Sequence, residues 1–200
     1  MILRSVKPHA PALALALLSF ALNAWGVRWG LPNLYTWAPD EIIPAQVLEG
    51  EQQRFSGGWW NPYPPFHFYV MAAAYAPVRW LSTEPVAIAS ASKTYARCFV
   101  AGRLVTSLMG AAIVLILYVC GLVLLDSTAG LGAGLLVLLS PTFVYYSKTA
   151  NFDVPYAFWF AVALVFYLRA LRDQRLSDWL GFSAASMLSI WCISPGTPFS

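Results

Sequence analysis

The sequence is poor in charge, because only 10% of its 200 residues are Asp, Glu, Lys or Arg, while 59% are hydrophobic. Soluble domains carry about 25% charged residues, so this composition excludes an ordinary soluble protein and indicates an integral membrane protein. The basic residues are scattered and form no stripe along any segment. This pattern excludes nucleic acid as a partner.

Cysteine is also scarce, and Cys98, Cys120 and Cys192 have no paired spacing. We expect them to be small buried side chains and not disulfide partners or metal ligands. The chain lacks credible strands, internal repeats and a glycine-rich phosphate loop. We therefore expect an all-α fold.

Long apolar runs predict the membrane spans. A span needs about 20 apolar residues, and a basic residue near its end can extend toward the headgroups. We expect an uncleaved signal-anchor at the N-terminus and about five transmembrane helices in a polytopic protein. The predicted spans lie within residues 8–27, 104–125, 127–147, 154–168 and 179–194.

Residues 66–81 are the ambiguous segment. They number only 16, Pro77 interrupts them, and two prolines precede them. Proline suits the start of a helix and not its interior. The segment can therefore cross the membrane, or lie flat on its outer face as an interfacial helix.

This choice decides on which side the acidic residues lie. Arg4 and Lys7 predict a cytoplasmic N-terminus, which puts Asp40 outside. If residues 66–81 lie flat, Asp153 is outside with Asp40, and if they cross, the two acids are on opposite sides. Basic residues in the short loops favour the flat arrangement.

Three carboxylates at the predicted membrane rim are candidates for chemistry. Asp40 and Glu41 lie in the loop of residues 31–65, and Asp153 stands two residues before Pro155, between two later spans. Acids at a membrane are costly to place and usually functional. Such a carboxylate can take a proton from an attacking hydroxyl, or coordinate a metal ion. Helix capping is the alternative role for Asp40 and Asp153.

Basic residues on the same side could bind a phosphate group, Arg through bidentate contacts and Lys as a point charge. The alternative is contact with lipid headgroups or with water. His67 is a further, weaker candidate for a ligand or base. The basic residues concerned are Arg54, Arg79, Lys93, Arg97, Arg103 and Lys148.

Four motifs follow one another along the chain: WAPDE, YPPFHFYVMAAAY, ARCFVAGRLVTSLMGAAIVLILYVCGLVL and GLGAGLLVLLSPTFVYYSKTANFDVP. In order and spacing the chain resembles the N-terminal part of the polyprenyl-phosphate-sugar-dependent glycosyltransferases of the GT-C class. Protein O-mannosyltransferases and the aminoarabinose transferases of lipid A belong to that class. The resemblance covers nearly all of residues 10–190.

The resemblance implies transfer of a sugar from a polyprenyl-phosphate donor to an acceptor hydroxyl on a protein, lipid or glycan. The reaction is expected at the outer face of a plasma or inner membrane. Asp40 is expected to act as base with support from Glu41, while Asp153 orients the acceptor or, with Asp40, holds a divalent metal ion. No other cofactor is expected.

The resemblance also implies a substrate-binding set. Arg97, with Lys93 and Lys148, is expected to neutralise the departing phosphate, and His67 completes the set. Residues 1–200 are expected to form the N-terminal part of a longer, truncated GT-C domain, with residues 31–95 as a large outer loop carrying juxtamembrane helices. A transporter or channel-like subunit, or a non-catalytic fragment, remains the alternative.

Overall fold

The structure is a computed structural model that describes residues 10–33, 35, 38–56, 63–82 and 92–193. Among these residues no strand occurs, and the all-α prediction is confirmed. Arg4 and Lys7, which predict the orientation, lie outside the described residues. The helices are α1 (Ala10–Ala24), α2 (Pro44–Gln52), α3 (Phe66–Trp80), α4 (Lys93–Leu124), α5 (Ser127–Leu138), α6 (Pro141–Ser147), α7 (Asp153–Asp173) and α8 (Leu176–Ile193).

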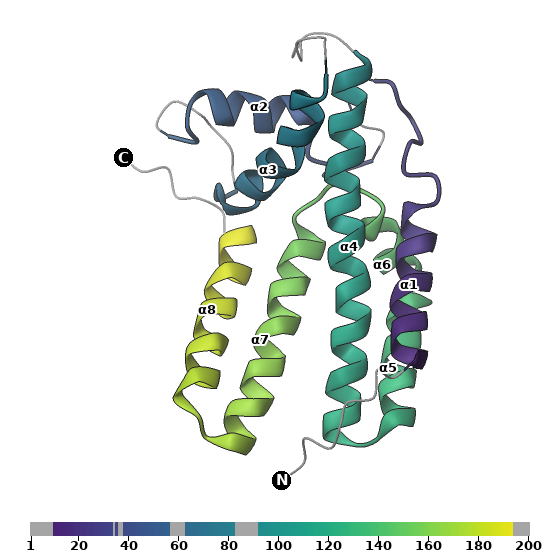
Figure 1. Cartoon of the computed structure of the whole chain (residues 1–200), viewed down its shortest axis with the longest axis vertical. Helices are drawn as coiled ribbons and strands as arrows, with labels where there is room; N and C mark the ends of the chain where they lie inside the picture. Colours follow the sequence, from purple (N-terminus) through teal and green to yellow (C-terminus); the bar gives the residue numbers. More distant parts are fainter. Residues whose placement is uncertain (1–9, 34, 36–37, 57–62, 83–91, 194–200) are drawn as a thin grey trace.

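Helix α4 is the centre of the arrangement. Helices α1, α5 and α7 pack along it, and α8 packs against α7 (Figure 1). The 32 residues of α4 span about 48 Å, whereas the hydrocarbon core of a bilayer is about 30 Å thick. One end of α4 therefore extends beyond the other long helices, and α2 and α3 lie across the bundle at that end (Figure 1).

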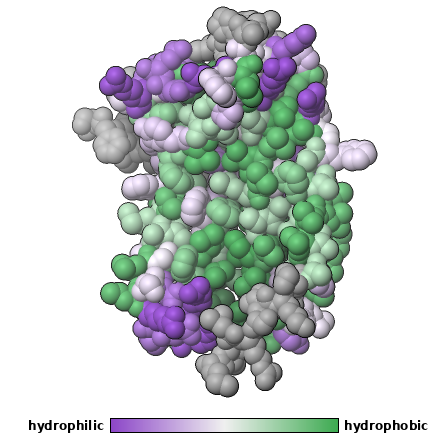
Figure 2. Space-filling view, in the orientation of Figure 1, coloured by the Kyte–Doolittle hydropathy of each residue, from purple (hydrophilic) through white to green (hydrophobic). Residues whose placement is uncertain are grey.

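The surface agrees with a membrane protein. Figure 2 shows a broad apolar band over the middle of the molecule, with hydrophilic residues gathered toward its two ends. By length and composition α4 and α7 can each cross a membrane, and α5 with α6 forms a third candidate that is bent by 69°. Helix α1 is a shorter apolar helix. The expected total of about five spans stays a prediction.

Short polar side chains begin several helices where the sequence turns from a loop to an apolar run. Ser92, Asp126 and Ser140 each accept a hydrogen bond from the backbone N–H three residues later. Such caps satisfy a donor that the first turn of a helix leaves free. Pro141 follows the third cap and cannot donate a backbone hydrogen bond, which explains the break between α5 and α6.

Helix α3 is too short to be a candidate span, and it lies across the end of the bundle as the flat alternative requires (Figure 1). One face is buried, and Tyr69 and Trp80 are exposed on the other. The buried face belongs to a core that supports the loops before α2 and α7. This core consists of Ile42, Val47, Leu48, Phe68, Met71, Tyr75, Cys98, Ala150 and Phe152.

Candidate functional site

The adjacent acids Asp40 and Glu41 have opposite environments. Asp40 is exposed and has a φ of 61°, a left-handed backbone conformation that Asp tolerates better than most residues. Glu41 is buried. Helix α2 begins only at Pro44, so the alternative role of Asp40 as its cap is wrong. The side chain of Gln46 instead accepts a hydrogen bond from the Ile43 N–H.

Glu41 is paired with Arg103 of α4. The Nε and Nη2 atoms of Arg103 lie 2.7 Å and 3.0 Å from the two carboxylate oxygens, which is a bidentate contact between two buried side chains. Charge-assisted pairs of this geometry are strong and directional. The sequence suggested Arg103 as a phosphate ligand, but its guanidinium is engaged with Glu41.

Arg103 also binds the segment that follows α1. Its Nη1 donates to the carbonyl oxygens of Val27 at 2.8 Å and Trp29 at 2.9 Å. Its guanidinium carbon lies 5.2 Å from the centre of the Trp29 ring and 5.6 Å from that of Phe99. These contacts offset the loss of hydration that burial of a charge imposes.

Two loops that are far apart in the sequence meet beside this ion pair. The Ile42 N–H donates to the Ala150 carbonyl at 2.6 Å, and the Ala150 N–H donates to Glu41 Oε1 at 3.2 Å. As a result, Asp40 lies close enough to Asp153 for the two carboxylates to repel one another. The structure thus brings Asp40 and Asp153 to the same end of the molecule.

Asp153 is the first residue of α7, and its side chain is exposed. Asn151 performs the capping, because its Oδ1 accepts a hydrogen bond from the Val154 N–H at 3.1 Å. The amide of Asn151 donates back to Thr149 and to the carbonyl of Tyr146, so this loop is held by its own side chain.

His67 lies in the core under the site and not on its surface. It is fully buried, its ring lies 5.8 Å from the Phe152 ring, and neither nitrogen has a hydrogen-bond partner among the described residues. Burial lowers the pKa of His67 to about 3. His67 is therefore neutral at physiological pH, and its role in substrate binding stays a prediction.

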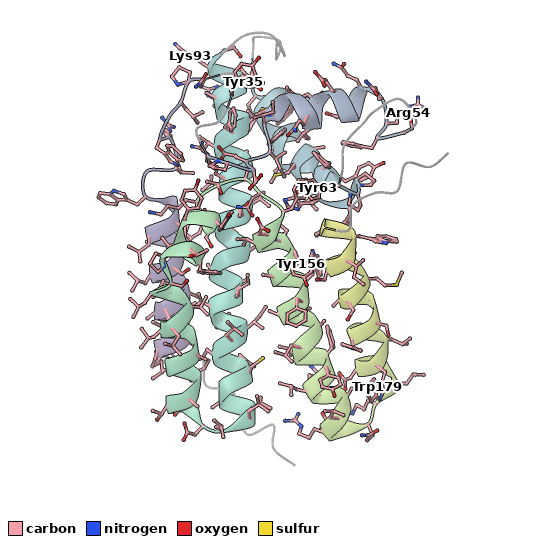
Figure 3. All side chains as sticks on the ribbon, turned by 180° about the vertical axis from the view of Figure 1, so that it is seen from behind. Tyr35, Arg54, Tyr63, Lys93, Tyr156 and Trp179 are labelled. Carbon is pink, nitrogen blue, oxygen red and sulfur yellow. The ribbon has the colours of Figure 1, made fainter. Side chains whose placement is uncertain are left out.

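The predicted phosphate ligands lie at different distances from the acids. Lys148 follows α6 and is two residues from Ala150. By helical rise, Arg97 is about 9 Å and Lys93 about 15 Å farther along α4 than Arg103. Figure 3 shows Lys93 at the outer end of α4, well beyond Tyr63 and Tyr156. Among these three basic residues, Lys148 is the nearest in sequence to Asp153, which lies five positions later.

Sequence reasoning missed Asn151, which holds the loop before α7, and Tyr75, which is buried near Glu41. An Asn shortly before an apolar run is a signal for a helix cap, but whether Asn151 or Asp153 serves as the cap depends on where α7 begins. Tyr75 has a buried hydroxyl without a hydrogen-bond partner among the described residues. Burial, with Cys98, Tyr95 and Glu41 nearby, raises the pKa of Tyr75 well above its ordinary value. Its hydroxyl stays protonated beside Glu41.

The possible metal ligands can be surveyed in the part of the chain that the structure describes. No group of three or more His, Cys, Asp or Glu side chains lies together there. Asp40 and Asp153 alone supply carboxylate oxygens at one place. The prediction of a divalent ion between them stays a prediction.

Comparison with known proteins points to the same class as the motifs. Residues 64–192, more than half of the chain, match the family described as dolichyl-phosphate-mannose-protein mannosyltransferase. The matched region includes Asp153 and Arg103, whereas Asp40 and Glu41 precede it. Comparison with curated proteins and with solved structures found no match. The chain therefore belongs to the dolichyl-phosphate-mannose-protein mannosyltransferase family, and it is a membrane glycosyltransferase of the mannosyltransferase type.

Proposed function

We propose that this protein transfers a mannosyl group from a polyprenyl-phosphate donor to an acceptor hydroxyl, with Asp40 as the general base. The observation that carries the proposal is the different state of the two adjacent acids. Asp40 is exposed next to Asp153, whereas both oxygens of Glu41 contact Arg103. A base must be free to reach the acceptor hydroxyl, and Asp40 meets this condition.

In the proposed reaction, Asp40 accepts the proton of the acceptor hydroxyl as its oxygen attacks the anomeric carbon of the sugar. The bond between that carbon and the phosphate oxygen breaks, and the lipid phosphate leaves with the electron pair. Asp153 orients the acceptor beside Asp40. Lys148 and Arg97 stabilise the charge that develops on the departing phosphate, with Lys93 farther away.

Glu41 then has a supporting role. Its pairing with Arg103 and its bond from the Ala150 N–H connect the Asp40 loop to α4 and to the loop that carries Asp153. A backbone held in an uncommon conformation is maintained only where its surroundings enforce it. The pair supports the left-handed conformation of Asp40 and its orientation toward the acceptor.

The proposed location follows from the same arrangement. The acids lie at the end of the bundle where α2 and α3 cover the long helices (Figure 1). We place this end at the outer face of a plasma or inner membrane, with a cytoplasmic N-terminus and several spans. We further propose that residues 1–200 are the N-terminal part of a GT-C domain whose donor and acceptor sites include other segments. The acceptor is a protein hydroxyl, as the family description suggests.

The acids also favour a transferase over a transporter. A transporter places its ionisable residues near the middle of the membrane and within broken spans. Here Asp40 lies in a loop, and Asp153 is the first residue of α7.

The Asp40→Asn variant tests the base assignment in membranes that contain the protein. Asn keeps the shape of the side chain and tolerates the left-handed backbone, but it cannot accept the proton. We expect mannosyl transfer to fall by about 100-fold or more, as general base catalysis contributes 10²–10⁴-fold. Glu49→Gln is the matched control, because Glu49 is another exposed acid at this end of the molecule. Transfer by Asp40→Asn at the level of Glu49→Gln would rule out the assignment.

A further inference from the structure

The end of α6 is held against α4 by a polar contact inside the bundle. The single proton of the Ser107 hydroxyl is shared between two carbonyl oxygens, that of Arg103 one turn earlier in α4 at 2.8 Å and that of Ser147, the last residue of α6, at 2.9 Å. Both side chains are fully buried. A hydrogen bond between membrane helices, with no water to compete for it, fixes their relative position.

Gly110 makes this close approach possible. A Cβ atom at this position would lie 2.6 Å from Oγ and 3.0 Å from Cβ of Ser147. Rotation of the Ser147 hydroxyl would relieve the first contact, whereas the second requires Ser147 itself to shift by a few tenths of an ångström. Glycine is thus required one turn below Ser107 for Ser147 to reach its observed position.

Helix α1 adds a third side chain at the same point. The Nδ2 atom of Asn23 lies 3.6 Å from the position of that Cβ, and it contacts Ser19 at 3.4 Å. Among the described residues, Oδ1 of Asn23 and Oγ of Ser147 have no hydrogen-bond partner, although both are buried. The amide oxygen of Asn23 can accept a hydrogen bond, and the hydroxyl of Ser147 can donate one. The side chains of Asn23 and Ser147 thus both adjoin Gly110, and each carries a buried polar atom that is unpaired within the described part of the chain.

The loop that follows Ser147 transmits its position to the acids. Thr149, Ala150 and Asn151 are all buried, and the Asn151 side chain ties the loop to itself. Ala150 exchanges hydrogen bonds with Ile42 and Glu41, beside Asp40. Asp153 follows three residues later. This segment has little freedom to absorb a shift at its start.

We infer that Gly110, Ser147 and Asn23 are positioning residues. They fix where the Lys148–Asp153 loop lies along α4, and thereby the placement of Asp153 beside Asp40. The inference rests on the proposed function, since it concerns the same two acids. All three residues are buried. They act through the backbone of the loop.

The Gly110→Ala variant tests this inference by pushing Ser147 away. We expect the turnover number for mannosyl transfer to fall about tenfold with little change in KM, because displacement of a reacting group by a fraction of an ångström is costly. The Gly110→Ala/Ser147→Gly double variant removes the atoms that clash and should restore turnover. Gly132→Ala is the matched control, since a Cβ there would meet nothing within 4 Å.

A second measurement does not depend on activity. Cysteines introduced as Asp40→Cys and Asp153→Cys are joined with a short bismaleimide, and the yield reports the spacing of the two positions. The native cysteines are buried, and the single-cysteine variants correct for them. We expect the yield to fall with Gly110→Ala, to recover with Ser147→Gly added, and to stay unchanged with Gly132→Ala. Ser107→Ala should lower it less than Gly110→Ala does.

Two results would overturn the inference. One is an unchanged cross-linking yield in Gly110→Ala. The other is a loss that Ser147→Gly does not restore, which would indicate a general folding defect. If the protein without these changes transfers no mannose while the cross-linking follows the expected pattern, then the proposed function fails and the positioning role stands.

Discussion

Two arginine–carboxylate pairs at opposite ends of the bundle differ in how completely the protein surrounds them. Arg103 and Glu41 meet at 2.7 Å at the end covered by α2 and α3, with side chains 1% and 0% exposed. Arg169 and Asp178 meet at 3.0 Å at the turn between α7 and α8. There the carboxylate is buried, but the Arg169 side chain is 49% exposed.

The difference lies in what satisfies each charge. The guanidinium of Arg103 has acceptors from two separate segments, the carbonyls of Val27 and Trp29 and the carboxylate of Glu41. Arg169, in contrast, is half exposed, and Asp178 Oδ2 has no partner among the described residues. A buried pair costs several kcal/mol in lost hydration unless its geometry is good. The first pair therefore holds loops in position around Asp40. The second pair mainly joins two neighbouring helices.

The largest expected effect is that of Arg103→Met, which leaves Glu41 buried without its partner. Removing one member of a buried pair costs about 3–5 kcal/mol. We expect a loss of this size in thermal unfolding in detergent micelles, together with loss of mannosyl transfer. Adding Glu41→Gln should recover much of the stability. A loss below 1 kcal/mol would show that Arg103 is no better held than Arg169.

His67 offers a second way to test how strictly the Asp40 end excludes charge. Its pKa is lowered to about 3 in the folded protein, against 6.5 for an ordinary histidine, so the unfolded chain binds the extra proton first. Stability is thus lost as the pH falls below 6.5. From pH 7 to pH 5 the loss from this residue should be about 2 kcal/mol. When unfolding is measured at both pH values, the stability of the His67→Phe variant should fall by about 2 kcal/mol less than that of the unchanged protein. Equal losses in the two proteins would contradict the burial of His67.

The Asp178→Asn variant tests the pair of Arg169 and Asp178 at the other end of the bundle. Because Arg169 is about half exposed, the pair is partly screened by water, and we expect a change within about 1 kcal/mol. Unfolding of this variant alongside Arg103→Met measures the difference between the two ends directly. A loss as large as that of Arg103→Met would remove the distinction.

The smallest effect is expected for Glu51→Gln. Glu51 pairs with Arg79 between α2 and α3, and the side chains are 41% and 39% exposed, respectively. Exposed pairs contribute about 0–1 kcal/mol, and salt screens them. We expect a change below 1 kcal/mol that disappears in high salt. A larger loss, insensitive to salt, would mean that the contact between α2 and α3 depends on this pair.

Parts of the fold were predictable because they depend on local properties. The apolar runs that predict α4, α5 and α7 lie where the structure has these helices. The length and prolines of residues 66–81 left their placement open, and the basic residues of the short loops favoured the flat arrangement, which the position of α3 across the end of the bundle fits (Figure 1). The roles of Arg103 and Asn151 were not predictable in this way. The bidentate partner of Arg103 is 62 positions away, and the capping by Asn151 depends on where α7 begins.

Composition and the lengths of the apolar runs are enough to identify an all-helical membrane protein with acids beside its apolar runs, because both are properties of each segment alone. Which of the two neighbouring acids is free to react depends instead on how distant segments pack together. Glu41 faces inward to Arg103 while Asp40 faces outward beside Asp153. This assignment depends on long-range packing of α4 and the loop before α7, since a buried carboxylate is stable only where a partner has been brought to it.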